Sequence, residues 1–91
     1  MQFILQNATG GSLTIFQEFI TTNFTQSPPP ILAAGGSATI AANPPFTAVI
    51  MYSGCNNAVT LIVDAAGAVS VVPAENTQHD PIKHTVTFNG A

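Results

Sequence analysis

The chain has 91 residues, of which 46% are hydrophobic and 5% are charged, with a formal net charge of −3 and one Lys or Arg. This length fits a single domain that spans residues 1–91. One cation cannot neutralise a phosphate backbone or an anionic lipid surface, so the composition argues against nucleic-acid binding and electrostatic docking on membranes.

Short apolar stretches rich in Val, Ile, Thr and Phe recur along the chain, and turn residues interrupt them at regular intervals. This pattern predicts an all-β protein, a small antiparallel β-sandwich or barrel of six to seven short strands. The apolar spacing in segment 12–20 is also compatible with one face of a helix. Its β-branched residues favour a strand instead, and this strand could contain a bulge. The predicted strands cover residues 2–8, 12–20, 37–42, 46–52, 58–64, 68–72 and 82–89.

Three connections have recognisable turn chemistry. Gly10 and Gly11 predict a tight hairpin between the first two strands, because both can take positive φ. The prolines of "TQSPPPI" (25–31) cannot donate to a ladder, which predicts a stiff surface crossover between sheets. The sequence "DAAG" (64–67) predicts a type I turn that ends on Gly67.

The segment 75–84, "ENTQHDPIKH", holds Glu75, Asp80, Lys83 and both histidines. His79 and His84 are five residues apart and lie on either side of a proline, a spacing that does not match common zinc sites. We interpret residues 75–81 as a solvated turn, and the last strand is predicted to begin at residue 82. Alternation from Ile82 to Phe88 then places His84 at the rim of the core.

No common enzyme or nucleotide-binding signature is present, and the single cysteine, Cys55, sits in the turn-like sequence "YSGCNN" (52–57). We therefore expect neither an enzyme nor catalytic residues, a metal site or a cofactor. Two sequons, at Asn7 and Asn23, would matter only in a eukaryotic secretory setting. No apolar run is as long as a membrane-spanning helix, and the N-terminus lacks the features of a signal peptide, which leaves localisation open between cytoplasmic and secreted.

A surface of Asn, Gln, Thr and Ser with few aromatic rings suits hydrogen bonding to sugar hydroxyls. The first hypothesis is therefore a non-enzymatic, lectin-like module whose loops bind a neutral polar ligand such as a glycan. Charged residues on edge strands discourage pairing between sheets of different molecules, and this chain has few of them. The sequence therefore predicts a homo-oligomer. The candidate ligand-binding residues are Tyr52, Asn56, Asn57, Asn76, Gln78, His79 and Asp80.

Two alternatives remain open at this point. A structural, self-assembling subunit would explain the neutral surface without any ligand. The segments "ILAAGGSATIAA" (31–42) and "FTAVIMYSG" (46–54) resemble the strand order of small secreted β-sandwiches such as the aegerolysin-type cytolysins. That resemblance implies a lipid-directed cytolysin or effector. The chain is shorter than those proteins and has no Trp, and the resemblance assigns no residues.

Overall fold

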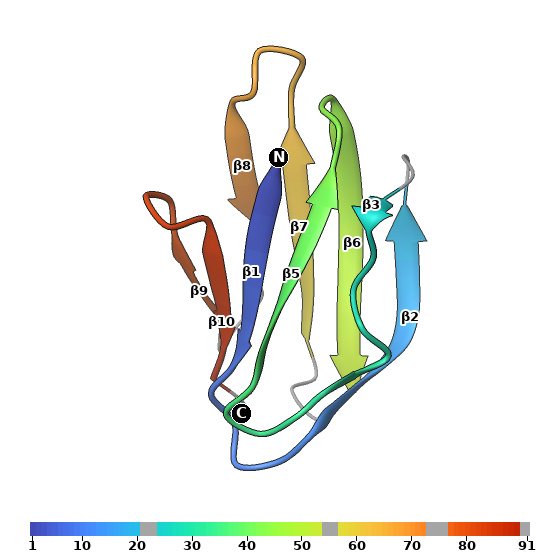
Figure 1. The fold of residues 1–91 in the computed structure, drawn as a ribbon, viewed down its shortest axis with the longest axis vertical. Coiled ribbons are helices and arrows are strands. Elements are labelled where there is room, and N and C mark those ends of the chain that lie inside the picture. Colours follow the sequence, from blue (N-terminus) through green and yellow to red (C-terminus); the bar gives the residue numbers. More distant parts are fainter. Residues whose placement is uncertain (21–23, 54–56, 73–76, 90–91) are drawn as a thin grey trace.

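The protein is an all-β sandwich of two five-stranded sheets (Figure 1). A computed structural model describes residues 1–20, 24–53, 57–72 and 77–89, and these contain ten strands and no helix. The first sheet has the order β3-β5-β1-β10-β9, with β3 (Phe24–Gln26), β5 (Ser37–Ala42), β1 (Gln2–Asn7), β10 (Thr85–Phe88) and β9 (Thr77–Asp80). The second has the order β4-β2-β6-β7-β8, with β4 (Ile31–Leu32), β2 (Leu13–Ile20), β6 (Phe46–Ser53), β7 (Asn57–Val63) and β8 (Val69–Val72).

The strand count exceeds the predicted six to seven because the structure adds three short strands. These are β3, β4 and β9, each of two to four residues. Such short segments carry too few residues for the alternation of apolar and polar side chains to be recognised in the sequence. The sandwich architecture itself was predicted.

Strand β1 lies inside the first sheet, where it pairs antiparallel with β5 and parallel with β10. Its buried side chains alternate with exposed ones, so that Phe3 and Leu5 are fully buried while Gln2, Ile4 and Gln6 are exposed. The period of two is what a strand with one solvated face requires. This alternation fixes which side chains of β1 reach the core and which reach the outer face of the sheet.

The core lies between the two sheets, and both sheets contribute to it. Phe3 packs edge-on against Phe46 with ring centroids 6.2 Å apart, and Tyr52 packs in the same way against Phe88 at 5.4 Å. These pairs join strands of opposite sheets and add specific ring contacts to the burial of apolar area. The buried hydrophobic residues are Phe3, Leu5, Leu13, Leu32, Ile40, Ala42, Phe46, Ala48, Ile50, Tyr52, Val59, Leu61, Val63, Val86 and Phe88.

The second sheet confirms two local predictions. The register between β2 and β6 shifts between Ile15 and Gln17, which is the bulge expected in this strand. The turn between β7 and β8 closes on Gly67 at φ 86°, and the Gly67 N–H donates to the Asp64 carbonyl over 3.0 Å. Antiparallel pairing of β7 with β8 then follows directly from this turn.

The predicted hairpin at Gly10 and Gly11 is wrong. Successive strands from β1 to β6 alternate between the two sheets, so β1 and β2 are not paired with each other. The side chain of Asn7 accounts for this geometry, since its Nδ2 donates to the carbonyls of Gly11 (2.8 Å) and Leu32 (2.9 Å). These bonds direct the chain across to the second sheet instead of back along the first.

The proline-rich segment confirms the predicted crossover. Residues 27–30 connect β3 of the first sheet to β4 of the second. The segment is anchored by its carbonyls, because Pro30 O accepts a bond from Ile15 N (2.9 Å) and Pro29 O accepts one from the Tyr52 hydroxyl (3.1 Å). Prolines supply acceptors but no donors, so a crossover built in this way leaves no proline N–H to be satisfied.

The C-terminal region corrects two further predictions. Residues 77–80 form β9 and pair with β10, so the predicted solvated turn over residues 75–81 is wrong for this part. The turn comprises residues 81–84 instead, and the last strand begins at Thr85 and not at Ile82. The polar sequence of β9 carries little strand propensity, and its pairing with β10 supplies the backbone hydrogen bonds that make it a strand.

Candidate functional site

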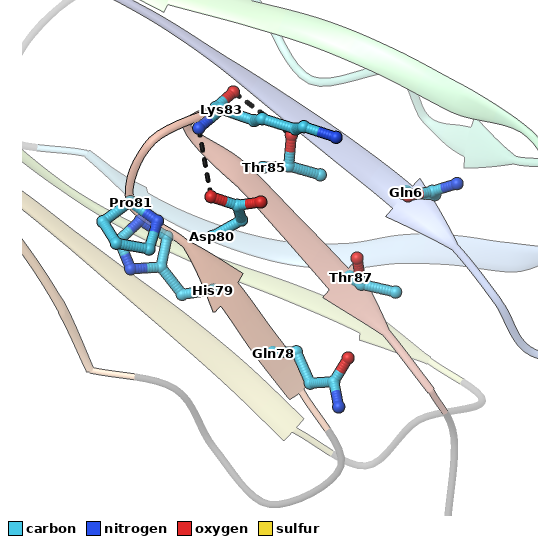
Figure 2. A pocket seen from close by; sticks show the side chains of 8 residues that line it. All are labelled: Gln6, Gln78, His79, Asp80, Pro81, Lys83, Thr85 and Thr87. Atoms are coloured by element: carbon cyan, nitrogen blue, oxygen red, sulfur yellow. Dashed lines mark hydrogen bonds between the residues drawn. The ribbon is translucent and has the colours of Figure 1, made fainter.

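A polar groove lies on the outer face of the first sheet, over β1, β10 and β9 (Figure 2). Its volume is about 700 Å³, a size within the range of small-molecule sites. The turn between β9 and β10 lies at one end of it and contributes Pro81 and Lys83 to the lining. The residues that line the groove are Gln6, Gln78, His79, Asp80, Pro81, Lys83, Thr85 and Thr87.

The strand register explains why these side chains meet. Gln6 of β1 is opposite Thr87 of β10, which is in turn opposite Gln78 of β9. Side chains in register on neighbouring strands leave the sheet on the same side. Since the next residues in β1 and β10 include the buried Leu5 and Val86, this row of amide and hydroxyl groups faces outward.

The adjacent row brings Asp80 opposite Thr85. Asp80 Oδ1 accepts hydrogen bonds from the backbone N–H groups of Ile82 (2.9 Å) and Lys83 (3.1 Å), which shape the turn. The Lys83 N–H lowers the pKa of the Asp80 carboxyl below its ordinary value, although partial desolvation opposes this effect. The Ile82 N–H and the Lys83 charge lower the pKa further. At neutral pH the group is therefore a carboxylate and only an acceptor.

Several polar groups in the groove have no hydrogen-bond partner within the described residues. They are the second carboxylate oxygen of Asp80, the Lys83 ammonium, the amides of Gln6 and Gln78, and the hydroxyl of Thr87. The Thr85 hydroxyl donates to the Lys83 carbonyl over 3.2 Å and retains acceptor capacity. The groove thus offers donors and acceptors that a bound ligand could satisfy.

The two histidines lie at the rim of the core. His84 is half-buried at φ 48°, and its ring packs edge-on against Phe3 with centroids 5.6 Å apart, which confirms its predicted place. His79 is in register with the buried Val86, so its side chain leaves the sheet on the side opposite to Gln78 and Asp80. His79 Nε2 and His84 Nδ1 are buried without a hydrogen-bond partner.

The groove is lined by three of the residues predicted to bind a ligand, Gln78, His79 and Asp80, but the His79 side chain points to the other side of the sheet. Tyr52 was wrongly predicted to be one, because its ring is buried in the core with 1% exposed area and its hydroxyl is bonded to Pro29. Asn56 and Asn76 lie outside the described residues, as do Cys55 and Glu75, and so does the side chain of Asn57.

Sequence reasoning missed Gln6, Pro81, Lys83, Thr85 and Thr87 as groove residues. The alternation in "TVTF" (85–88) does mark Thr85 and Thr87 as outward-facing, whereas the three consecutive apolar residues in "QFILQ" (2–6) leave the direction of Gln6 unspecified. The missing information was the parallel pairing of β1 with β10, which joins the two ends of the chain. No local pattern in either strand specifies that partner.

The structure also bears on the two sequons. The Asn7 side chain is fully buried and its amide nitrogen is engaged by two carbonyls, so it is inaccessible for glycosylation in the folded protein. Asn23 lies outside the described residues. Asn7 is therefore a structural residue.

Neither a metal-ligand cluster nor a membrane-spanning helix occurs in the described part of the chain. No three side chains of His, Cys, Asp or Glu come together there as a metal site would require. Nor do these residues include a helix with the length and apolarity needed to cross a membrane. Comparisons with protein-family models, with curated proteins and with solved structures each found no match.

Proposed function

We propose that the protein is a non-enzymatic binding module that holds a neutral, hydroxyl-rich ligand such as a glycan in the groove of the first sheet. The observation that carries this proposal is the set of unpartnered polar groups from Gln6, Gln78, Thr87, Asp80 and Lys83 on one concave surface. Such groups gain most from a ligand that can both donate and accept hydrogen bonds.

The charges of the groove favour a ligand without net charge. Asp80 and Lys83 contribute one negative and one positive group to the lining, and the other lining residues are uncharged or histidine. A sugar hydroxyl can donate to the Asp80 carboxylate and accept from the Lys83 ammonium, and charge-assisted bonds of this kind are the stronger ones. The amides of Gln6 and Gln78 can do both with neighbouring hydroxyls.

The proposal places the site on a strand surface and not in the loops of the sequence hypothesis. No Phe or Tyr lines the groove in the described part of the chain, so recognition rests on hydrogen bonds and not on stacking against an aromatic ring. A site without stacking has modest affinity per groove, and several copies in one assembly would strengthen attachment to a repeated ligand.

A glycan array followed by calorimetry tests the proposal. Gln78→Ala should weaken binding of the best glycan about three- to tenfold, because one neutral hydrogen bond contributes about 0.5–1.5 kcal/mol. Gln2→Ala is the matched control, since Gln2 is an exposed glutamine of β1 outside the groove. Absence of binding to every glycan, or equal losses in the two variants, would contradict the proposal.

A further inference from the structure

An exposed apolar residue lies in the turn at one end of the groove. Ile82 is 89% exposed, more than Ile4, Ile31 and Ile62, the other large hydrophobic residues found exposed in the described chain. It lies in the β9–β10 turn between Pro81 and Lys83, both of which line the groove. The polar lining therefore ends next to the exposed apolar side chain of Ile82.

Hydrogen bonds fix the backbone conformation of the β9–β10 turn that carries Ile82. The Asp80 carboxylate accepts hydrogen bonds from the N–H groups of Ile82 and Lys83, and the Thr85 hydroxyl donates one to the Lys83 carbonyl. A non-glycine residue at positive φ, His84, completes the turn. Because the backbone of the turn is already ordered, a contact made by Ile82 would not bear the entropy cost of ordering a loop.

The residue type is unusual for the position. Turns favour Gly, Pro, Asn, Asp and Ser, each for a conformational or hydrogen-bonding reason, and Ile offers none of these. Nothing in the described structure covers the Ile82 side chain. A choice of residue that opposes local preference without a packing gain in the free protein is expected at binding positions.

We propose that the ligand is amphipathic, with a hydroxyl-rich head in the groove and an apolar group that packs against Pro81 and Ile82. This inference rests on the proposed function and adds a second requirement to it. The chemical class is a glycoside with an apolar aglycone, which exists both as a glycolipid in a membrane and as a soluble glycoside. In each case, burial of the aglycone against Ile82 supplements the hydrogen bonds of the head.

Titration calorimetry with paired glycosides tests the inference. The probes are the methyl and n-octyl glycosides of glucose, galactose and mannose, with the octyl compounds kept below their micelle concentration. The wild-type protein should bind the octyl member of a recognised pair about tenfold more tightly, as expected when a few methylene groups leave water. In Ile82→Ser this ratio should fall toward one while the affinity for the methyl glycoside is unchanged.

Ile31→Ser is the matched control, because Ile31 is 59% exposed on β4 at the edge of the opposite sheet. It should keep the full ratio between octyl and methyl glycosides. If wild type binds both members of a pair equally, or if Ile82→Ser keeps the ratio, the inference is overturned while the proposed function stands. If no glycoside binds and the glycan array is also negative, the result contradicts the proposed function itself, and with it the inference.

A second arm separates the two sources of the ligand. Vesicles of neutral phosphatidylcholine are prepared with and without a glycolipid that carries the recognised sugar. Sedimentation of the protein with the glycolipid vesicles, lost in Ile82→Ser, supports the inference with a membrane glycolipid as the source. Binding of the octyl glycoside without vesicle binding supports it with a soluble glycoside. Equal sedimentation with both kinds of vesicle overturns it, because the sugar would then play no part.

Discussion

At the scale of single residues, Asn7 connects the two sheets. It is fully buried on β1, its amide donates to Gly11 in the crossover and to Leu32 on β4, and its Oδ1 accepts from the backbone and hydroxyl of Thr9. A buried amide with every bond made is stabilising, whereas one with unmet bonds is costly. The direction of each bond therefore matters as much as the size of the side chain.

Asn7→Asp tests that directionality. The substitution keeps the shape and the acceptor for Thr9, but it removes both donors and turns a charged oxygen toward two carbonyls. We expect the free energy of unfolding in urea at pH 7 to fall by about 2–4 kcal/mol, in line with the loss of buried hydrogen bonds and an unpaired buried charge. Asn43→Asp, at an exposed position, should change it little. Wild-type stability in Asn7→Asp would show that the bridge does not hold the sheets.

At the scale of elements, the β7–β8 turn shows how far local chemistry determines structure. Asp64 accepts from the N–H groups of Ala66 and Ala68 through Oδ1, both at 2.9 Å, and Gly67 supplies the positive φ that closes the turn. All the information needed for this hairpin lies within a few consecutive residues. The prediction from the sequence was accordingly correct.

Gly67→Ala should destabilise the protein by about 1–2 kcal/mol, because an L-residue with a Cβ is disfavoured at φ 86°. Space is not the cause, since a Cβ at this position would meet nothing within 4 Å. Gly10→Ala is the control, as it has equal space but no positive φ, and it should be neutral or slightly stabilising. Thermal unfolding of the two variants measures the difference, and identical midpoints would refute the role assigned to Gly67.

The elements that sequence reasoning misplaced depend on distant partners. β9 is a strand because it pairs with β10, and β1 meets β10 although they lie at opposite ends of the chain. Alternation shows that Thr87 faces outward, but not that Gln6 lies beside it on the neighbouring strand. Of the groove residues, the predicted binding loops therefore included only Gln78, His79 and Asp80, which are consecutive in the chain. Tyr52 was misassigned because the sequence 52–57 was interpreted as a loop, whereas Tyr52 belongs to β6 and occupies one of its inward-facing positions.

At the scale of the whole molecule, scarcity of charge affects the sheet edges. Among the described strands, β3, β4, β8 and β9 end the two sheets, and only β9 contains a charged residue. Natural sheets discourage pairing between molecules by placing charges, especially Lys, on such strands. The edge strand β8, with the sequence VSVV, contains no charged residue. The predicted homo-oligomer would use such an edge, and two copies of β8 can pair antiparallel about a two-fold axis.

Sedimentation equilibrium over a range of concentrations tests this prediction. The wild-type protein should show an average mass that rises above that of one chain, and Ser70→Lys should suppress the rise, because Ser70 is an exposed residue of β8. Gln2→Lys adds the same charge at an exposed position of β1, a strand inside the other sheet, and should associate like wild type. A wild-type chain that stays monomeric at all concentrations would contradict edge pairing. Since the groove faces outward from the first sheet while β8 ends the second, association through β8 would leave the groove of each copy open to a ligand.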